Sequence, residues 1–180
     1  VARETLGLPA DARIVGTAGA LAADRGIADL FEAFLELAAR DDNLWLVCAG
    51  PRDAAPSRYR HPRIVDLGLL PLDRVPGVYA ALDVAVVCNR DSAFGRYCFP
   101  QKLYEIIACS VPVVAAALGD VATLLAATPA ALYRPGDVGD LAAHIAEQLT
   151  APQPIAGLAV PDWNDLAALC ANVFAGVVQR

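Results

Sequence analysis

The segment from residue 89 to residue 105 holds the densest set of side chains that could do chemistry. It follows a short apolar run and reads Asn-Arg-Asp-Ser-Ala-Phe-Gly-Arg-Tyr-Cys-Phe-Pro-Gln-Lys-Leu-Tyr-Glu. Pro100 suits the first turn of a helix, and a helix there places Lys102 and Glu105 on neighbouring positions of one face. One interpretation of this spacing is a surface ion pair worth about 0–1 kcal/mol. The other is a ligand contact, because the helix leads directly into an apolar strand.

A second group of candidate residues follows the first apolar run. The turn Gly16-Thr17-Ala18-Gly19 is rich in small residues, and Arg25 with Gly26 opens a long helical pattern. Such a turn lets a phosphate approach backbone N–H groups, and a cation at a helix start favours a diphosphate more than it favours stability. An arginine in solvent is the alternative. The G-x-G-x-x-G dinucleotide pattern does not fit, and no acidic residue ends the second strand.

The elements that must position these residues alternate between short β-rich runs and longer helical patterns. Strands are predicted at Arg13–Ala18, Leu44–Ala49, Arg63–Leu67, Asp83–Cys88, Val111–Ala116 and Ala130–Arg134. Helices are predicted over about 27–38, 75–82, 100–109 and 138–149, and after Asp162. Continuous apolar strands separated by helices predict an α/β fold, a Rossmann-like doubly wound parallel sheet of six strands. Such sheets bind ligands beyond the carboxyl ends of their strands.

Composition narrows the classes of protein that remain. With 57% apolar and 19% charged residues, the chain of 180 residues suits one well-buried domain. A net charge of −6 argues against nucleic-acid binding. The five cysteines are scattered and neither they nor the two histidines have metal-ligand spacing, so we expect reduced thiols in the cytoplasm and no metal site or cofactor. We expect Trp45 and Trp163 to be packing residues.

The remaining predictions concern domain organisation. Residues 150–161 are rich in proline and small residues and indicate a linker to the final helix. That helix has one apolar face, formed by Leu166, Leu169, Cys170, Val173, Phe174 and Val177. The chain starts at Val1 and contains no methionine, so we expect a segment N-terminal to it.

Motifs in order along the chain resemble the C-terminal domain of the retaining GT-B glycosyltransferases, especially the large family 4, or group 1. The run 99–105, Phe-Pro-Gln-Lys-Leu-Tyr-Glu, and the later Ala108-Cys109-Ser110-Val111-Pro112-Val113-Val114 resemble that family's F-P-x-K-L-x-E-x-x-A-x-G-x-P-V-V stretch. Residues 19–26 resemble its glycine–basic–glycine turn, and Ala49-Gly50-Pro51 the end of its second strand. The likeness runs from about residue 4 to residue 150, and it implies one half of a GT-B fold.

The resemblance implies a role for each candidate residue. Glu105 would bind the ribose hydroxyls of a nucleoside-diphosphate sugar, Arg25 would contact the diphosphate, and Gly19 would leave room for phosphate or sugar. Backbone groups at Leu70 would meet the base. Lys102 and the helix start near Gly95 and Arg96 would stabilise the charge that develops on the diphosphate during retaining transfer. The acceptor would be held by an N-terminal domain absent from this chain, and contact with the cytoplasmic face of a membrane would come only through that domain.

Several positions depart from the family pattern. Tyr97 stands where the first glutamate of the E-x7-E motif would fall, with Asp91 as a possible substitute, and Ala20 replaces a frequent arginine. Ser110 stands where glycine is usual. These departures leave two alternatives open: a degenerate GT-B half that acts as a non-catalytic interaction module, and an enzyme similar to a sugar-nucleotide epimerase, which shares the fold.

Overall fold

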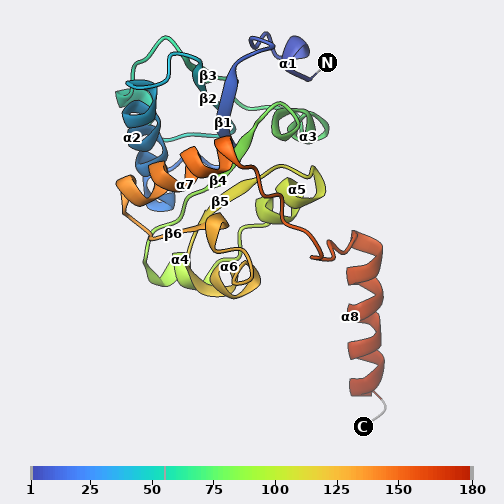
Figure 1. The fold of residues 1–180 in the computed structure, drawn as a ribbon. Coiled ribbons are helices and arrows are strands. Elements are labelled where there is room, and N and C mark those ends of the chain that lie inside the picture. Colours follow the sequence, from blue (N-terminus) through green and yellow to red (C-terminus); the bar gives the residue numbers. More distant parts are fainter. Residues whose placement is uncertain (1, 55, 179–180) are drawn as a thin grey trace.

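A six-stranded parallel sheet forms the centre of the protein in the computed structural model, which describes residues 2–54 and 56–178. The strand order is β3-β2-β1-β4-β5-β6 (Figure 1). The strands are β1 (Arg13–Ala18), β2 (Leu44–Ala49), β3 (Ile64–Asp66), β4 (Val84–Val87), β5 (Val113–Ala116) and β6 (Leu132–Tyr133). Every neighbouring pair is parallel. The predicted doubly wound α/β fold is therefore confirmed.

β3, β4, β5 and β6 are each shorter than predicted, and a proline lies at the lost end of the last two. β1 and β2 have their predicted bounds, whereas β5 begins at Val113 instead of at Val111. Pro112 has no N–H to donate to a neighbouring strand, although its carbonyl still accepts a hydrogen bond from Ala85. β6 is shortened because the preceding 3-10 turn η4 (Pro129–Ala131) takes up residues that were predicted as strand.

Helices cover both faces of the sheet, as its buried strands require. α2 (Ile27–Ala38) and α7 (Val138–Thr150) pack on one face. On the other lie α3 (Val75–Tyr79), α5 (Lys102–Ala108) and α6 (Gly119–Leu124). Sequence patterns predicted the first four of these helices. They did not predict α6, the short helices α1 (Ala2–Thr5) and α4 (Ala93–Tyr97), or the 3-10 turns η1 (Ala23–Arg25), η2 (Pro56–Arg58) and η3 (Leu72–Arg74).

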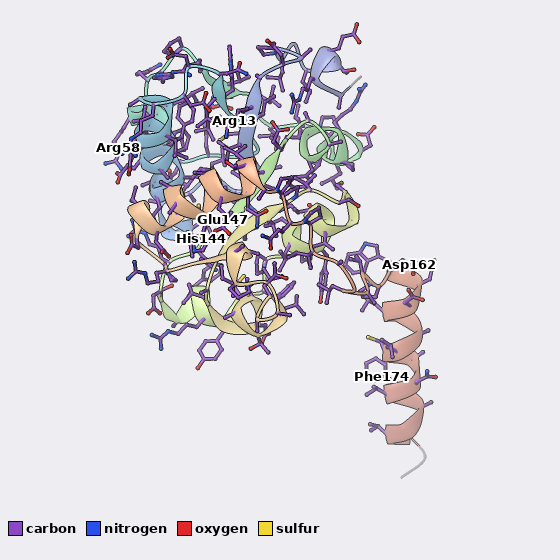
Figure 2. All side chains as sticks on the ribbon, in the orientation of Figure 1. Arg13, Arg58, His144, Glu147, Asp162 and Phe174 are labelled. Atoms are coloured by element: carbon purple, nitrogen blue, oxygen red, sulfur yellow. The ribbon has the colours of Figure 1, made fainter. Side chains whose placement is uncertain are left out.

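The last helix, α8 (Trp163–Val178), projects away from the α/β body (Figure 1). Residues 151–162 lead to it without forming a helix or strand, and Ile155 and Leu158 of this segment pack against the core. Figure 2 shows Phe174 on α8 far from the sheet, and the predicted apolar face of this helix is exposed rather than buried. Among the described residues, no helix is long and apolar enough to cross a membrane.

Candidate functional site

A cavity of about 990 Å³ opens where the winding of the sheet reverses. β1 and β4 lie side by side in the middle of the sheet, and the connections after them lead to opposite edges. The chain therefore diverges beyond the carboxyl ends of these two strands, which is where open α/β sheets bind ligands. Residues 17–20 at the end of β1 and 87–89 at the end of β4 line the cavity, together with one face of α5.

Lys102, in the first turn of α5, carries a positive charge into this cavity. Its ammonium lies beside the turn after β1, because a Cβ added to Gly19 would come within 3.0 Å of Lys102 Nζ. Burial lowers the pKa of Lys102, and the nearby Arg25 lowers it further. Within residues 2–54 and 56–178, Lys102 has neither a hydrogen bond nor an ion pair. The ion-pair interpretation of Lys102 and Glu105 is therefore wrong, and the ammonium is available to an anion.

Arg25 supplies a second cation at the same cavity, from the end of the turn η1. Its guanidinium lies 4.3 Å from the centre of the Phe94 ring, and its Nη1 donates to Cys98 Sγ at 4.0 Å. A ring and a thiol hold the side chain in place without neutralising its charge. Gly26 makes the sharp turn into α2 with φ of 68°, so the next residue already begins the helix.

Glu105 lies one helical turn after Lys102, on the same cavity wall. Its carboxylate is exposed, and it contributes with burial to raising the pKa of Tyr79. The Tyr79 hydroxyl donates to the carbonyl of Ala18 at 3.3 Å, which ties α3 to the end of β1. The cavity thus has two cations at one end of α5 and a carboxylate farther along it.

The structure brings together Gly19, Arg25, Lys102 and Glu105, all of which line the cavity. Leu70 does not line the cavity within the described residues; its side chain is half-buried against the core, and the predicted contact of its backbone with a base stays a prediction. The other two predicted residues, Gly95 and Arg96, do not line the cavity within the part of the chain that the structure describes.

Gly95 and Arg96 organise the helix α4. Gly95 is buried, its N–H donates to Ser92 Oγ at 3.0 Å, and a Cβ there would collide with the carbonyl of Arg90. Arg96 forms a two-fold hydrogen bond to Asp91, at 2.6 and 3.0 Å, which lowers the pKa of that carboxyl. Because Asp91 carries the opposite charge, this exposed pair balances the charge of Arg96.

Sequence reasoning assigned no role to several residues of the cavity. Thr17 and Asn89 are buried polar residues that follow or end the two central strands. Asn89 Nδ2 donates to the carbonyl of Gly95 at 3.3 Å and so fixes the loop above the site. Their places at strand ends were the available signal. Cys88 gave no signal; burial raises its pKa to about 12, which keeps this thiol neutral beside Lys102.

Comparison with known proteins identifies the family of this chain. Residues 12–151 match the model of the family described as glycosyl transferases group 1. The chain belongs to the group 1 glycosyltransferases. A D-inositol 3-phosphate glycosyltransferase of Catenulispora acidiphila is 30% identical over 99% of this chain and 46% of its own length. A 2-deoxystreptamine glucosyltransferase of Streptomyces kanamyceticus is 29% identical over 85% of this chain and 41% of its own length. This chain therefore spans less than half of either relative.

Solved glycosyltransferase structures share the fold. Anabaena HepE, solved in complex with UDP, superimposes with a TM-score of 0.67 at 23% identity, over 84% of this chain and 43% of that protein. The C-terminal domain of a group 1 glycosyl transferase from Francisella tularensis gives the same TM-score at 16% identity, over 83% of this chain and 80% of that domain. The group 1 chain described here thus has the fold of the C-terminal half of a GT-B protein.

The departures from the family pattern have different structural settings. Tyr97, where the family's first glutamate would fall, ends α4 with its side chain 90% exposed. Asp91, the possible substitute, is paired with Arg96 and does not line the cavity. Ser110 follows α5 with φ of 56°, a left-handed conformation that glycine adopts at lower cost. The first departure affects the surface near the site, and the last affects only the backbone.

Proposed function

We propose that this chain is the donor half of a retaining glycosyltransferase that binds a nucleoside-diphosphate sugar. The single observation that carries the proposal is the cavity at the switch point, where Arg25 and Lys102 present uncompensated charge beside Gly19. Family membership and the UDP complex of Anabaena HepE support the same choice of ligand. The base and the sugar are left open by this proposal.

The two cations would act on the leaving group. When the bond between the anomeric carbon and the diphosphate oxygen breaks, the electron pair stays with the diphosphate, which gains negative charge. Fixed cations in a partly dry cavity stabilise such charge more strongly than water does, because they need not reorganise. Arg25 and Lys102 would therefore supply the charge neutralisation from this half without a metal ion. Glu105 would accept hydrogen bonds from the ribose hydroxyls and so fix the position of the leaving group.

The acceptor would be held by a second, N-terminal domain of the same protein. The exposed apolar face of α8 supports this part of the proposal, because an isolated helix of this length is only marginally stable in water. Leu169, Val173 and Phe174 are exposed on this helix, which projects from the α/β body (Figure 1). We place the protein in the cytoplasm or at the cytoplasmic face of a membrane, as its free cysteines suggest.

Calorimetric titration of this chain with UDP, GDP and their sugars tests the donor site. We expect at least one of these ligands to bind, and no sugar to be transferred without the second domain. Absence of binding by all of them at millimolar concentration would contradict the proposal.

The role of Glu105 can be tested with a matched pair of ligands. Glu105→Ala should lower the affinity for the nucleotide that binds by about tenfold, which corresponds to the free energy of a hydrogen bond to a charged group. The same substitution should have no effect on the analogue that lacks the 2′ and 3′ hydroxyls. Glu147→Ala, on the opposite face of the sheet, serves as the control. Equal losses for both ligands would remove the ribose contact from the proposal.

The non-catalytic alternative is favoured by the exposed tyrosine at position 97 in place of a glutamate. A full-length protein that binds the nucleotide but neither transfers nor hydrolyses a labelled donor would support this alternative. Release of an epimerised sugar in the same assay would indicate the epimerase-like enzyme instead.

A further inference from the structure

One face of α5 lines the cavity along the whole length of the helix. Gln101 and Lys102 line its beginning, Glu105 its middle, and Ala108 and Cys109 its end. With a rise of 1.5 Å per residue, Glu105 lies about 4.5 Å and Cys109 about 10 Å beyond Lys102 along the helix axis. A nucleoside diphosphate presents diphosphate, ribose and base in the same order. If the first two groups lie at Lys102 and Glu105, the base lies beside the last turn of α5.

The last turn of α5 faces the start of α3, where Cys109 Sγ donates to the carbonyl of Pro76 at 4.0 Å. Val75 and Pro76 line the cavity, together with Leu72, which is 89% exposed, and Trp163, which is 77% exposed. A single exposed apolar side chain on a protein surface is ordinary. Here two large exposed apolar side chains, those of Leu72 and Trp163, come from segments remote in sequence and line the same cavity. Trp163 is therefore not the packing residue expected from the sequence; its indole is left open at a binding cavity.

The backbone around Trp163 is fixed on both sides. Asp162 Oδ1 accepts hydrogen bonds from the N–H groups of Asn164 and Asp165, at 2.7 and 2.8 Å, and Asp165 Oδ2 accepts from the N–H of Asp162 at 3.1 Å. This reciprocal cap defines the first turn of α8. On the other side, Ile155 and Leu158 anchor the preceding segment on the core. The indole is thus held at the cavity by ordered chain.

We propose that Trp163 is a positioning residue that stacks on the base of the bound nucleoside diphosphate, with Leu72 at the same end of the cavity. This inference rests on the donor function proposed above. Every nucleobase has a flat π-face, and an indole stacks on it with little preference among the bases. Trp163 would hold the base at the far end of α5 and thereby help to place the diphosphate at Lys102.

Tryptophan fluorescence tests the inference directly. The chain contains only Trp45 and Trp163, so a Trp45→Phe variant reports on Trp163 alone. UDP should quench the emission of this variant and shield the indole from acrylamide. Inorganic diphosphate, which has no base, should compete with UDP at Lys102 but leave the emission unchanged. Quenching by inorganic diphosphate equal to that by UDP would overturn the inference.

Substitutions give an independent measurement. Trp163→Ala should lower the affinity for UDP about tenfold in calorimetry. This effect is near the lower end of the range for base stacking, because the indole is largely exposed. Trp163→Phe should recover most of the affinity, and neither change should alter the binding of inorganic diphosphate. Phe174→Ala, on the same helix but away from the cavity, is the matched control and should bind UDP normally.

The outcomes separate the inference from the function on which it rests. If UDP or GDP binds the unaltered chain but Trp163→Ala binds the same nucleotide equally well, the stacking role is wrong and the donor site stands. If UDP, GDP and their sugars all fail to bind the unaltered chain, the donor site is wrong and the stacking role falls with it. Circular dichroism of Trp163→Ala shows whether the fold is intact. If only α8 loses helicity in this variant, the affinity of Trp163→Phe for UDP decides whether an aromatic ring at this position stacks on the base.

Discussion

Two arginines at the amino edge of the sheet and the two cations of the cavity at its carboxyl edge have different kinds of partner. At the amino edge, Arg3 donates to the carbonyls of Ala10, Ala12 and Ala81 and to the Asp83 carboxylate, at 2.7 to 3.0 Å. Arg63 at the same edge donates to three carbonyls of neighbouring segments. In the cavity at the carboxyl edge, Arg25 and Lys102 form no ion pair with a carboxylate among the described residues.

This contrast separates charge used for stability from charge kept for a ligand. An arginine that uses most of its five N–H donors on carbonyls and a carboxylate holds loops together and has little left to offer an anion. A half-buried lysine without a partner destabilises the fold, and such a cost is typical of functional sites. The difference predicts that substitutions at the two edges will affect different measurements.

The largest expected effect is on stability at the amino edge. Arg3→Met removes one donor group from four acceptors and should lower the free energy of unfolding by about 2–3 kcal/mol. Affinity for UDP should not change. Urea denaturation and calorimetry measure the two quantities. Arg40→Met, which breaks only the exposed pair with Glu36, is the control and should cost less than about 1 kcal/mol. A loss of UDP affinity in Arg3→Met would break the contrast between the edges.

A smaller effect is expected in the pH dependence of binding at the carboxyl edge. Burial lowers the pKa of Lys102 in the free protein, and a bound diphosphate favours the charged amine and so raises that pKa again. UDP should therefore bind with uptake of protons at alkaline pH. Its affinity should decline as the pH rises through the lowered pKa of Lys102, before an ordinary lysine would lose its proton. Calorimetry in two buffers of different ionisation enthalpy measures the uptake.

Two variants of Lys102 sharpen this test. Lys102→Arg keeps its charge at all these pH values and should abolish the alkaline decline. Lys102→Met should bind UDP about tenfold more weakly at neutral pH and should be more stable by about 1 kcal/mol. The sign follows from the lowered pKa: the burial penalty of the charged amine is present at neutral pH and is relieved only as the pH rises toward the ordinary lysine value. A less stable Lys102→Met protein would contradict this account.

The smallest expected effect is at the backbone of the amino edge. Ser110 adopts a φ of 56° directly after α5, where its N–H donates to the carbonyl of Ile107. Ser110→Gly should raise the free energy of unfolding by about 0.5–1 kcal/mol in urea denaturation, because glycine reaches this conformation without steric cost. Ser110→Ala should give no gain, since alanine keeps the Cβ. UDP affinity should be the same in all three proteins.

The site itself was predicted in part. Lys102 and Glu105 could be placed on one helix face because their spacing is local, and Gly19 and Arg25 could be placed at the carboxyl edge because they follow the first strand. Leu70, Gly95 and Arg96 have equally suitable positions in the sequence. Leu70 is instead packed on the core, Gly95 is buried by close contact with the Arg90 carbonyl, and the charge of Arg96 is balanced by Asp91.

The sequence alone determined the alternation of strands and helices, and with it the doubly wound class of the fold. The spacing of apolar residues along the chain carries this information, because that spacing can be read without knowing which residues are neighbours in space. Only the tertiary structure decided which cations stay free and which indole lies open at the cavity. Those properties depend on partners brought together by the tertiary structure: Phe94 and Cys98 beside Arg25, the turn at Gly19 beside Lys102, and Trp163 in one cavity with Lys102 and Glu105.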